Sequence, residues 1–155
     1  MIALTKGMFA FVDAADYEKI SLRTWACFIN GRRFYAGTTI EGRRVMMHHL
    51  IMGKFPNLTI DHRNRNGLDN RRSNLRIATY TQNAQNSTKA IRNTKSKYKG
   101  VAFAKGSIKK WRSEIRVNGK KIYIGWYETE IEAARAYDKA ALEHFGEFAC
   151  VNFPE

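Results

Sequence analysis

The chain has 155 residues, of which 44% are hydrophobic, enough for packed cores in one or two small domains. No segment approaches the run of about 18 apolar residues that a spanning helix needs, so neither a membrane protein nor a membrane partner is expected. Lys and Arg number 27 against 14 Asp and Glu, and the net charge of +13 favours a polyanionic partner. The chain start lacks a signal segment, and Cys27 and Cys150 are isolated, so we expect reduced thiols and a cytoplasmic protein.

The charge is distributed unevenly along the chain. Residues 1–96 carry 16 basic and 6 acidic side chains, and residues 97–127 carry 9 basic and 1 acidic. Residues 128–155 reverse the balance, with 2 basic and 7 acidic side chains. Charge that serves only solubility does not require such segregation, so the C-terminal part is expected to have one basic and one acidic face.

The first 57 residues predict a small α+β lead-in. Apolar runs and turn formers indicate strands, a short helix and a hairpin turn at Asn30-Gly31. The expected elements are strands at 8–12, 24–29 and 34–39, a helix at 14–20, and a helix or strand at 45–52.

Residues 58–83 predict a strand, a loop, a second strand and a helix. A short β-prone run ends at Asp61 and His62, and a loop rich in turn formers follows. The second strand is expected at 75–78, and a polar helix is expected to begin near Thr79. This order can bring side chains from the first strand and the helix together.

The side chains of this segment suit the cleavage of a phosphodiester. Asp61 and Asn83 offer hard oxygen ligands for a cation, and His62 offers a base for an attacking water. Asn74 is placed to fix the loop through side-chain bonds to the backbone. Basic residues that suit a phosphate-rich substrate surround the site; they are Arg63, Arg65, Arg71, Arg72 and Arg76.

A polar, basic stretch separates this segment from a second domain. We expect domains at 1–88 and 98–155, joined by a linker at 89–97 that either tethers them or follows a phosphate backbone. The second domain predicts a three-stranded antiparallel sheet, because residues 110–117 alternate apolar and charged side chains and Asn118-Gly119 is a strong hairpin signal.

One helix is expected to pack behind this sheet. Thr129 and Glu132 form a capping box at its start, and it is expected to end near Phe145, before Gly146. The tryptophans are expected in the cores; they are Trp25, Trp111 and Trp126.

The first domain resembles the ββα-metal motif of HNH endonucleases at Asp61-His62, Asn74 and Asn83, at LDNRRSNLRIAT between them and at the MHHLIMG segment before them. The similarity is greatest to phage- and intron-encoded homing enzymes with Asn at the third motif position, and covers roughly residues 5–90. It implies that Asp61 and Asn83 hold one divalent cation, Mg²⁺ or Mn²⁺. It also implies that His62 is the general base and that Asn74 orients the loop.

One position departs from that family's pattern. Family members often have Arg where this chain has His49, which leaves His48 as the better match. A structural and a catalytic role both stay open for His48.

The second domain resembles the APETALA2/ethylene-response type of DNA-binding domain over nearly all of residues 97–154. The matching segments are YKGV at 98–101, KWRSEIRV at 110–117, IYIGWYET at 122–129, EAARAYDKAAL at 132–142 and VNFP at 151–154. The resemblance implies that the sheet lies in the major groove with the helix behind it. The residues that it turns toward DNA are Lys99, Lys110, Glu114, Arg116, Lys121 and Tyr123, and strand alternation adds Arg112. At Ala102 and Ala104, plant members usually have an Arg that contacts DNA.

Together these features predict a metal-dependent DNA endonuclease of the homing type, most like those of phages or mobile elements, in the cytoplasm or nucleoid of a host cell. A monomer with one site is expected to nick one strand of double-stranded DNA. The alternative is a non-catalytic DNA-binding regulator, which has no need to retain Asp61, His62 and Asn83 together. An RNA-binding protein fits the charge but not a sheet patterned for the major groove, which A-form RNA hides.

Overall fold

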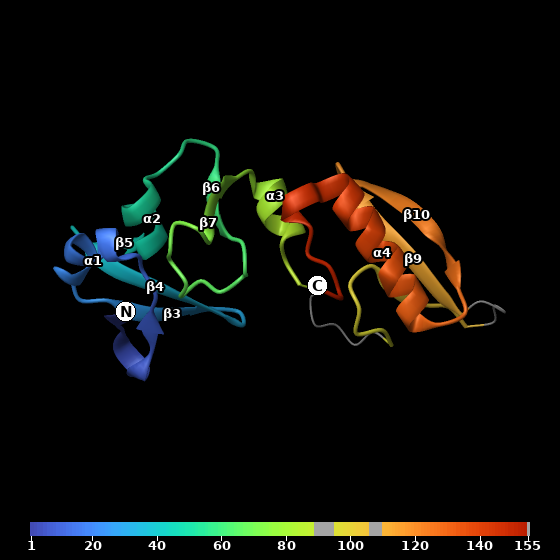
Figure 1. Cartoon of the computed structure of the whole chain (residues 1–155), viewed down its shortest axis with the longest axis horizontal. Coiled ribbons are helices and arrows are strands. Elements are labelled where there is room, and N and C mark those ends of the chain that lie inside the picture. Colours follow the sequence, from blue (N-terminus) through green and yellow to red (C-terminus); the bar gives the residue numbers. More distant parts are fainter. Residues whose placement is uncertain (89–94, 106–109, 155) are drawn as a thin grey trace. The chain divides into compact units, whose positions relative to one another are not determined.

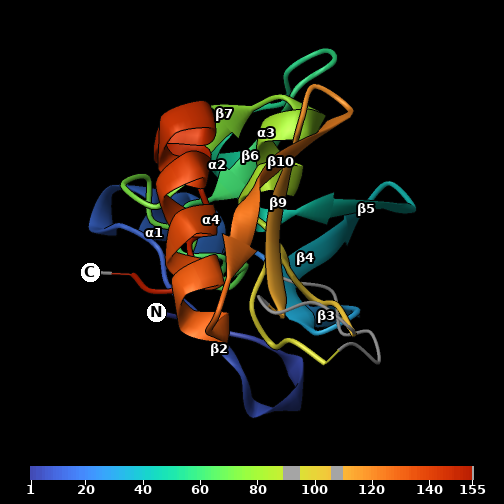
Figure 2. The same cartoon turned by 90° about the vertical axis from the view of Figure 1, so that its right-hand side faces the viewer.

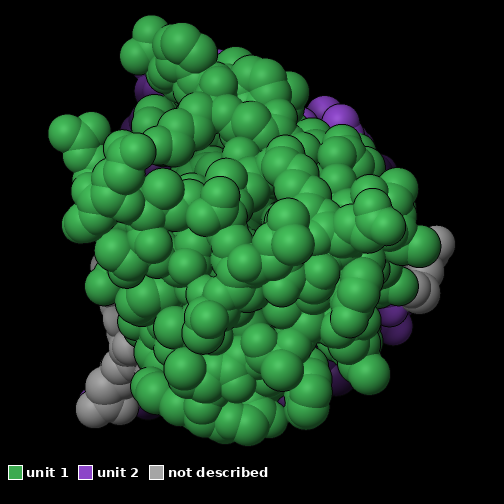
Figure 3. All heavy atoms as spheres, turned by 90° about the vertical axis from the view of Figure 1, so that its left-hand side faces the viewer, with its two compact units in different colours: residues 1–83 green, residues 84–155 purple. Residues whose placement is uncertain are grey.

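The computed structural model describes residues 1–88, 95–105 and 110–154. The chain divides into two compact units, residues 1–83 and 84–155, which Figure 3 shows in different colours. Each unit combines helices with small antiparallel sheets (Figure 1), which confirms the predicted α+β class. Residues 89–94, which make up most of the expected linker, lie outside the described residues. Among the helices described, none is long and apolar enough to cross a membrane.

The first unit contains three small antiparallel sheets, which pair β1 with β2, join β3, β4 and β5 in that order, and pair β6 with β7. Its elements are β1 (Ile2–Ala3), a 3₁₀ turn (Thr5–Gly7), β2 (Phe9–Ala10), α1 (Ala14–Ser21), β3 (Ala26–Asn30), β4 (Arg33–Ile40), β5 (Arg43–Met46), α2 (Met47–Met52), β6 (Thr59–His62), β7 (Leu75–Ala78) and α3 (Tyr80–Gln85). The segment at 45–52, expected as a helix or a strand, contains both, because β5 ends where α2 begins. The unit boundary falls within α3, after Asn83.

The core of this unit forms around Trp25. Its side chain is fully buried, and its indole N–H donates to the carbonyl oxygen of Ile20 at 2.8 Å. Ile20 and Met47 pack in the same cluster, so α1 and α2 both contribute to this core. The predicted core position of Trp25 is therefore confirmed.

The lead-in is bonded to the loop between β6 and β7. Phe11 donates its amide to Leu68 O and accepts from the amide of Asn70, both at 2.8 Å. The Arg72 guanidinium holds both carboxylate oxygens of Asp16 at 2.7 and 2.8 Å, and the Arg72 amide donates to Asp13 Oδ2 at 2.7 Å. These contacts join residues more than fifty positions apart, so the loop takes its shape from the N-terminal segment as well as from its own turns.

The second unit is a three-stranded antiparallel sheet with one long helix, as predicted. Its elements are β8 (Val101–Phe103), β9 (Trp111–Val117), β10 (Lys120–Tyr127), α4 (Glu130–Phe145) and a 3₁₀ turn (Gly146–Phe148). The strand order is β10-β9-β8, and Figures 1 and 2 show α4 against one face of this sheet. The capping box is present, because Thr129 Oγ1 accepts from the amide of Glu132 and the Glu132 carboxylate accepts from that of Thr129.

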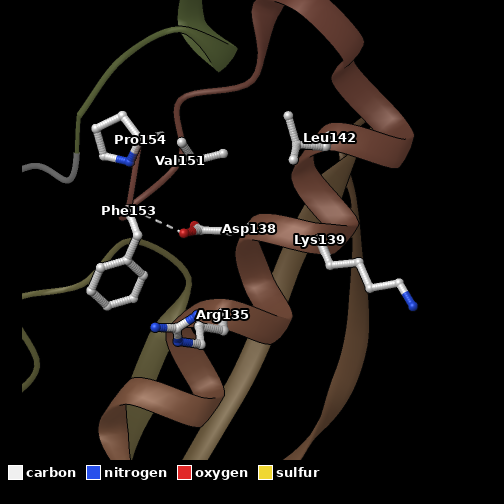
Figure 4. Close-up of a pocket in the computed structure, with 7 residues that line it drawn as sticks. All are labelled: Arg135, Asp138, Lys139, Leu142, Val151, Phe153 and Pro154. Atoms are coloured by element: carbon white, nitrogen blue, oxygen red, sulfur yellow. Dashed lines mark hydrogen bonds between the residues drawn. The ribbon is translucent and has the colours of Figure 1, made fainter.

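The C-terminal segment is fixed to α4 by one carboxylate. Asp138 is buried and accepts from the amides of Asn152 and Phe153 at 2.7 and 3.0 Å, as Figure 4 shows for Phe153. The Arg135 guanidinium lies 5.5 Å from the centre of the Phe153 ring. These contacts hold the C-terminal segment along α4.

Two glycines of the second unit allow the cost of backbone strain to be distinguished from the cost of overpacking. Gly100 and Gly119 both adopt left-handed conformations, with φ of 77° and 78°. A Cβ on Gly100 overlaps the ring of Tyr137, whereas a Cβ on Gly119 meets open space. We expect Gly119→Ala to cost about 1–2 kcal/mol from backbone strain, and Gly100→Ala roughly 1–3 kcal/mol more from overpacking. Urea unfolding followed by circular dichroism measures both, and equal losses would contradict the packing role.

Candidate active site

The pairing of β6 with β7 positions Asp61 and His62. Asp61 lies opposite Arg76 in the register, and His62 lies opposite Leu75. Arg76 Nε and Nη2 both donate to Asp61 Oδ2, at 2.8 and 2.7 Å, and both side chains are buried. A buried carboxylate needs such a partner, because an unpaired buried charge is strongly unfavourable. Arg76 therefore fixes the position of the Asp61 carboxylate.

The predicted cation ligands form a sparse oxygen set. Among the described residues, no group of three or more His, Cys, Asp and Glu side chains is placed to hold a metal ion. A cation at Asp61 would depend on that carboxylate, the Asn83 amide oxygen, water and substrate phosphate. Mg²⁺ fits this set, since it keeps several waters and binds through one or two carboxylates plus phosphates. Asn83 is half-buried on α3, and its pairing with Asp61 stays a prediction.

The side-chain amide of Asn74 forms hydrogen bonds to the loop between β6 and β7 through both its nitrogen and its oxygen. Its Nδ2 donates to Asp69 O at 2.7 Å, and its Oδ1 accepts from the amide of Asn64 at 2.9 Å. The Asn64 side chain in turn donates to Asp69 Oδ2 at 2.9 Å. Hydrogen bonds from Arg71 lower the pKa of Asp69 and keep its carboxylate ionised as an acceptor. This network is the geometry that the proposed loop-orienting role of Asn74 requires.

His62 lies in a buried cluster of rings. The His48 ring centre is 5.1 Å from that of His62, at an interplanar angle of 85°, and the Tyr35 ring centre is 5.9 Å away. His62 Nε2 lies 3.5 Å from Asn70 Oδ1. Burial lowers the pKa of His62, and the Asn70 contact opposes this change in part. The imidazole is therefore neutral at pH 7 and able to accept a proton.

Sequence reasoning predicted the strand at 34–39 but missed that this strand, β4, covers the ring cluster. Arg33 and Tyr35 lie two residues apart on β4, so their side chains share one face. The charge of Arg33 acts on His62 and contributes to its lowered pKa. Gly67 packs so closely on the backbone of Phe34 and the ring of Tyr35 that a Cβ would not fit. The alternation of β4 was visible in the sequence, but its contact with the loop was not.

The arginines proposed for phosphate binding occupy different environments. Arg72 pairs with Asp16 and Arg76 with Asp61, both at 2.7 Å, so each already compensates a carboxylate. Arg63 donates its amide to Asn74 O at 2.8 Å, and Arg65 donates its amide to His62 O at 2.8 Å with a positive φ of 63°. The backbones of Arg63 and Arg65 are therefore part of the loop that directly follows His62.

The residues proposed to face DNA lie mostly on the outer face of the second unit's sheet. Ser113 and Ile115 are buried toward α4, so alternation turns their neighbours outward; these are Arg112, Glu114 and Arg116. The register adds Tyr123 opposite Glu114 and Lys121 opposite Arg116. Glu114 pairs with both Arg112 and Lys121, at 3.1 and 3.0 Å. Lys110 is exposed just before β9.

Two residues are placed differently from the expectation. Lys99 Nζ donates to the carbonyl oxygens of Gln85 and Ser87, both at 2.7 Å, so this ammonium is bonded to the unit's own backbone. Trp111 is half-buried against the core, as predicted, but the predicted core position of Trp126 is wrong. Trp126 is 36% exposed, because a register shift between Tyr123 and Gly125 turns it to the outer face opposite Arg112.

Comparison with known proteins shows the family of this chain. The HNH endonuclease family matches the chain over residues 45–85. An uncharacterized HNH endonuclease of Acanthamoeba polyphaga mimivirus is 35% identical over 149 residues, which are 95% of this chain and 76% of the viral protein. The chain belongs to the HNH endonuclease family. This confirms the prediction of a nuclease.

The C-terminal part of this HNH family member is similar to plant proteins. An AP2-like ethylene-responsive transcription factor of Arabidopsis thaliana is 38% identical over 73 residues, which are 47% of this chain and 15% of the plant protein. APETALA2-like protein 2 of Oryza sativa subsp. indica is 39% identical over 70 residues, which are 45% of this chain and 16% of that protein. The chain spans only a small share of these plant relatives. The predicted resemblance to APETALA2-type domains is confirmed.

His48 gives the first unit a specific dependence on pH. Burial, together with His62 and His49, lowers the pKa of His48 to about 3, so the folded unit holds it neutral. Stability from this residue is complete above pH 6.5 and is lost as pH falls from 6.5 toward 3, because only the unfolded state binds the proton. Between about pH 6 and pH 4 we expect the wild type to lose up to about 1.4 kcal/mol more per pH unit than His48→Gln. Urea unfolding at several pH values tests this, and parallel profiles would contradict it.

Proposed function

We propose that this HNH endonuclease cleaves DNA with a divalent cation as cofactor, as a homing-type enzyme that nicks one strand. The observation that carries the proposal is a neutral, buried His62 next to the fixed carboxylate of Asp61. These groups supply a base and an oxygen ligand, which are what hydrolysis of a phosphodiester requires. One such site in a monomer favours cleavage of one strand per binding event.

Each group has a distinct role in the proposed reaction. His62 accepts a proton from the water that attacks the scissile phosphate in line, which leaves a 5′ phosphate and a 3′ hydroxyl. Asn74 keeps His62 in place by bonding the loop that follows it. Asp61 and Asn83 would hold Mg²⁺ or Mn²⁺, which neutralises charge on the phosphate and the departing oxygen when bound.

We further propose that the outer face of the β10-β9-β8 sheet binds the major groove of double-stranded DNA. The face is basic, since Arg116 is exposed and Arg112 and Lys121 flank a single Glu114. The acidic residues of the unit gather instead in and around α4, which covers the opposite face. The similarity to APETALA2-type proteins supports the same orientation.

The catalytic part is tested by nicking of a supercoiled plasmid at matched protein concentration. His62→Ala is expected to lower the rate by roughly 10²–10⁴-fold, because it removes the group proposed to accept the proton of the attacking water. Asn83→Ala and addition of EDTA to the wild type are expected to abolish nicking. Asn83 is a cleaner target than Asp61, because removal of Asp61 takes away the carboxylate that compensates the buried Arg76, at a cost of about 3–5 kcal/mol. His144→Ala, on an exposed position of α4, is the control, and full activity in EDTA would refute the metal-dependent mechanism.

The docking face is tested with a matched pair of charge deletions. Arg116→Ala on the sheet and Lys139→Ala on α4 each remove one exposed positive charge. Arg116→Ala is expected to weaken DNA binding and to reduce the dependence of log K on log salt by about 0.9, because one phosphate contact is lost. If Arg116 reaches a base edge instead, the loss is about 1–3 kcal/mol and confined to particular bases. Gel shifts at several salt concentrations measure this, and a greater loss with Lys139→Ala would reverse the assignment of the face.

A further inference from the structure

The outer face of the C-terminal sheet carries an aromatic pair among its charges. Tyr123 and Trp126 are 49% and 36% exposed, and their ring centres lie 6.1 Å apart. Simple alternation would place residues three apart on opposite faces. The register shift puts Tyr123 opposite Glu114 but Gly125 opposite Ser113, so one residue of β10 has no partner. This bulge moves Trp126 outward to the side of Tyr123.

The register of the three strands shows which residues lie beside Tyr123 and Trp126. Ala102, Arg112 and Trp126 lie opposite one another across β8, β9 and β10, so they form one row on the outer face. The Arg112 guanidinium lies 6.0 Å from the centre of the Tyr123 ring. The outer face therefore presents Ala102 and Trp126 on either side of Arg112, among other basic side chains.

We propose that Trp126, with Tyr123 and Ala102, forms an apolar subsite that contacts the C5-methyl groups of thymine in the major groove. The inference rests on the proposed DNA-binding function of this face. A thymine methyl is the apolar feature of the major groove, and apolar side chains contact it directly. The positive charges beside the pair attract the DNA backbone, which brings the aromatic rings to the base edges. Trp126 would then set a preference for A·T pairs at the positions it covers.

Replacement of thymine by deoxyuridine tests the subsite, because it removes only the methyl group. The full chain, in EDTA to prevent cleavage, first selects its preferred duplexes from a randomised pool. Affinity for a selected duplex is then compared with that for the same duplex containing deoxyuridine at the contacted positions. The wild type is expected to lose roughly fourfold for each methyl group contacted, from the transfer free energy of one such group. Trp126→Ala is expected to bind both duplexes equally.

The control is Ile131→Ala, which removes an apolar side chain that is 51% exposed on α4 and should leave the discrimination intact. Tyr123→Ala provides a second test of the subsite if Trp126→Ala unfolds. Duplex binding without any response to deoxyuridine, or selected sites without thymine, would overturn the subsite alone. Failure to bind duplexes, or a preference for single strands in which the rings stack on bases, would overturn the proposed docking face as well.

Discussion

The buried ion pair between Asp61 and Arg76 is the interaction on which the candidate site depends. It joins two strands at opposed register positions, so the charge of one strand is compensated only when β6 and β7 pair correctly. A shift by one residue would place the two side chains on opposite faces of the strand pair and so separate the two charges. The position of His62, one residue along β6, follows from this pairing. The pair thus specifies geometry even where its net contribution to stability is small.

The fold was largely predictable from local signals. The strand at 75–78 and the capping box at Thr129 follow from short sequence patterns, and both occur where expected. The bulge in β10 was not predictable, because alternation alone assigns Trp126 to the inner face. The change from β5 to α2 within one apolar run was ambiguous for a similar reason: a short hydrophobic segment satisfies both periodicities.

The sequence predicts a chemistry for the candidate site but does not show what surrounds it. Asp61, His62 and Asn74 are identified by residue type and spacing within one short segment. The ring contacts of His62 come from β4 and α2, and no local pattern specifies which distant side chain approaches. The sequence alone does not distinguish an arginine that is paired with a carboxylate from one that is available to a substrate. In the structure, Arg72 and Arg76 are both paired with carboxylates. Partner choice among charges is a property of tertiary structure.

The bonds between the lead-in and the loop at 63–74 limit how modular this nuclease is. The family match covers residues 45–85, yet Phe11, Asp13 and Asp16 supply hydrogen bonds that the loop uses. A fragment cut to the matched segment would leave those backbone groups and Arg72 to water and lose the constraint on the loop. The piece to transfer in engineering is therefore the whole of residues 1–83, because a grafted motif alone would carry the predicted ligands without the segment that holds their loop in place.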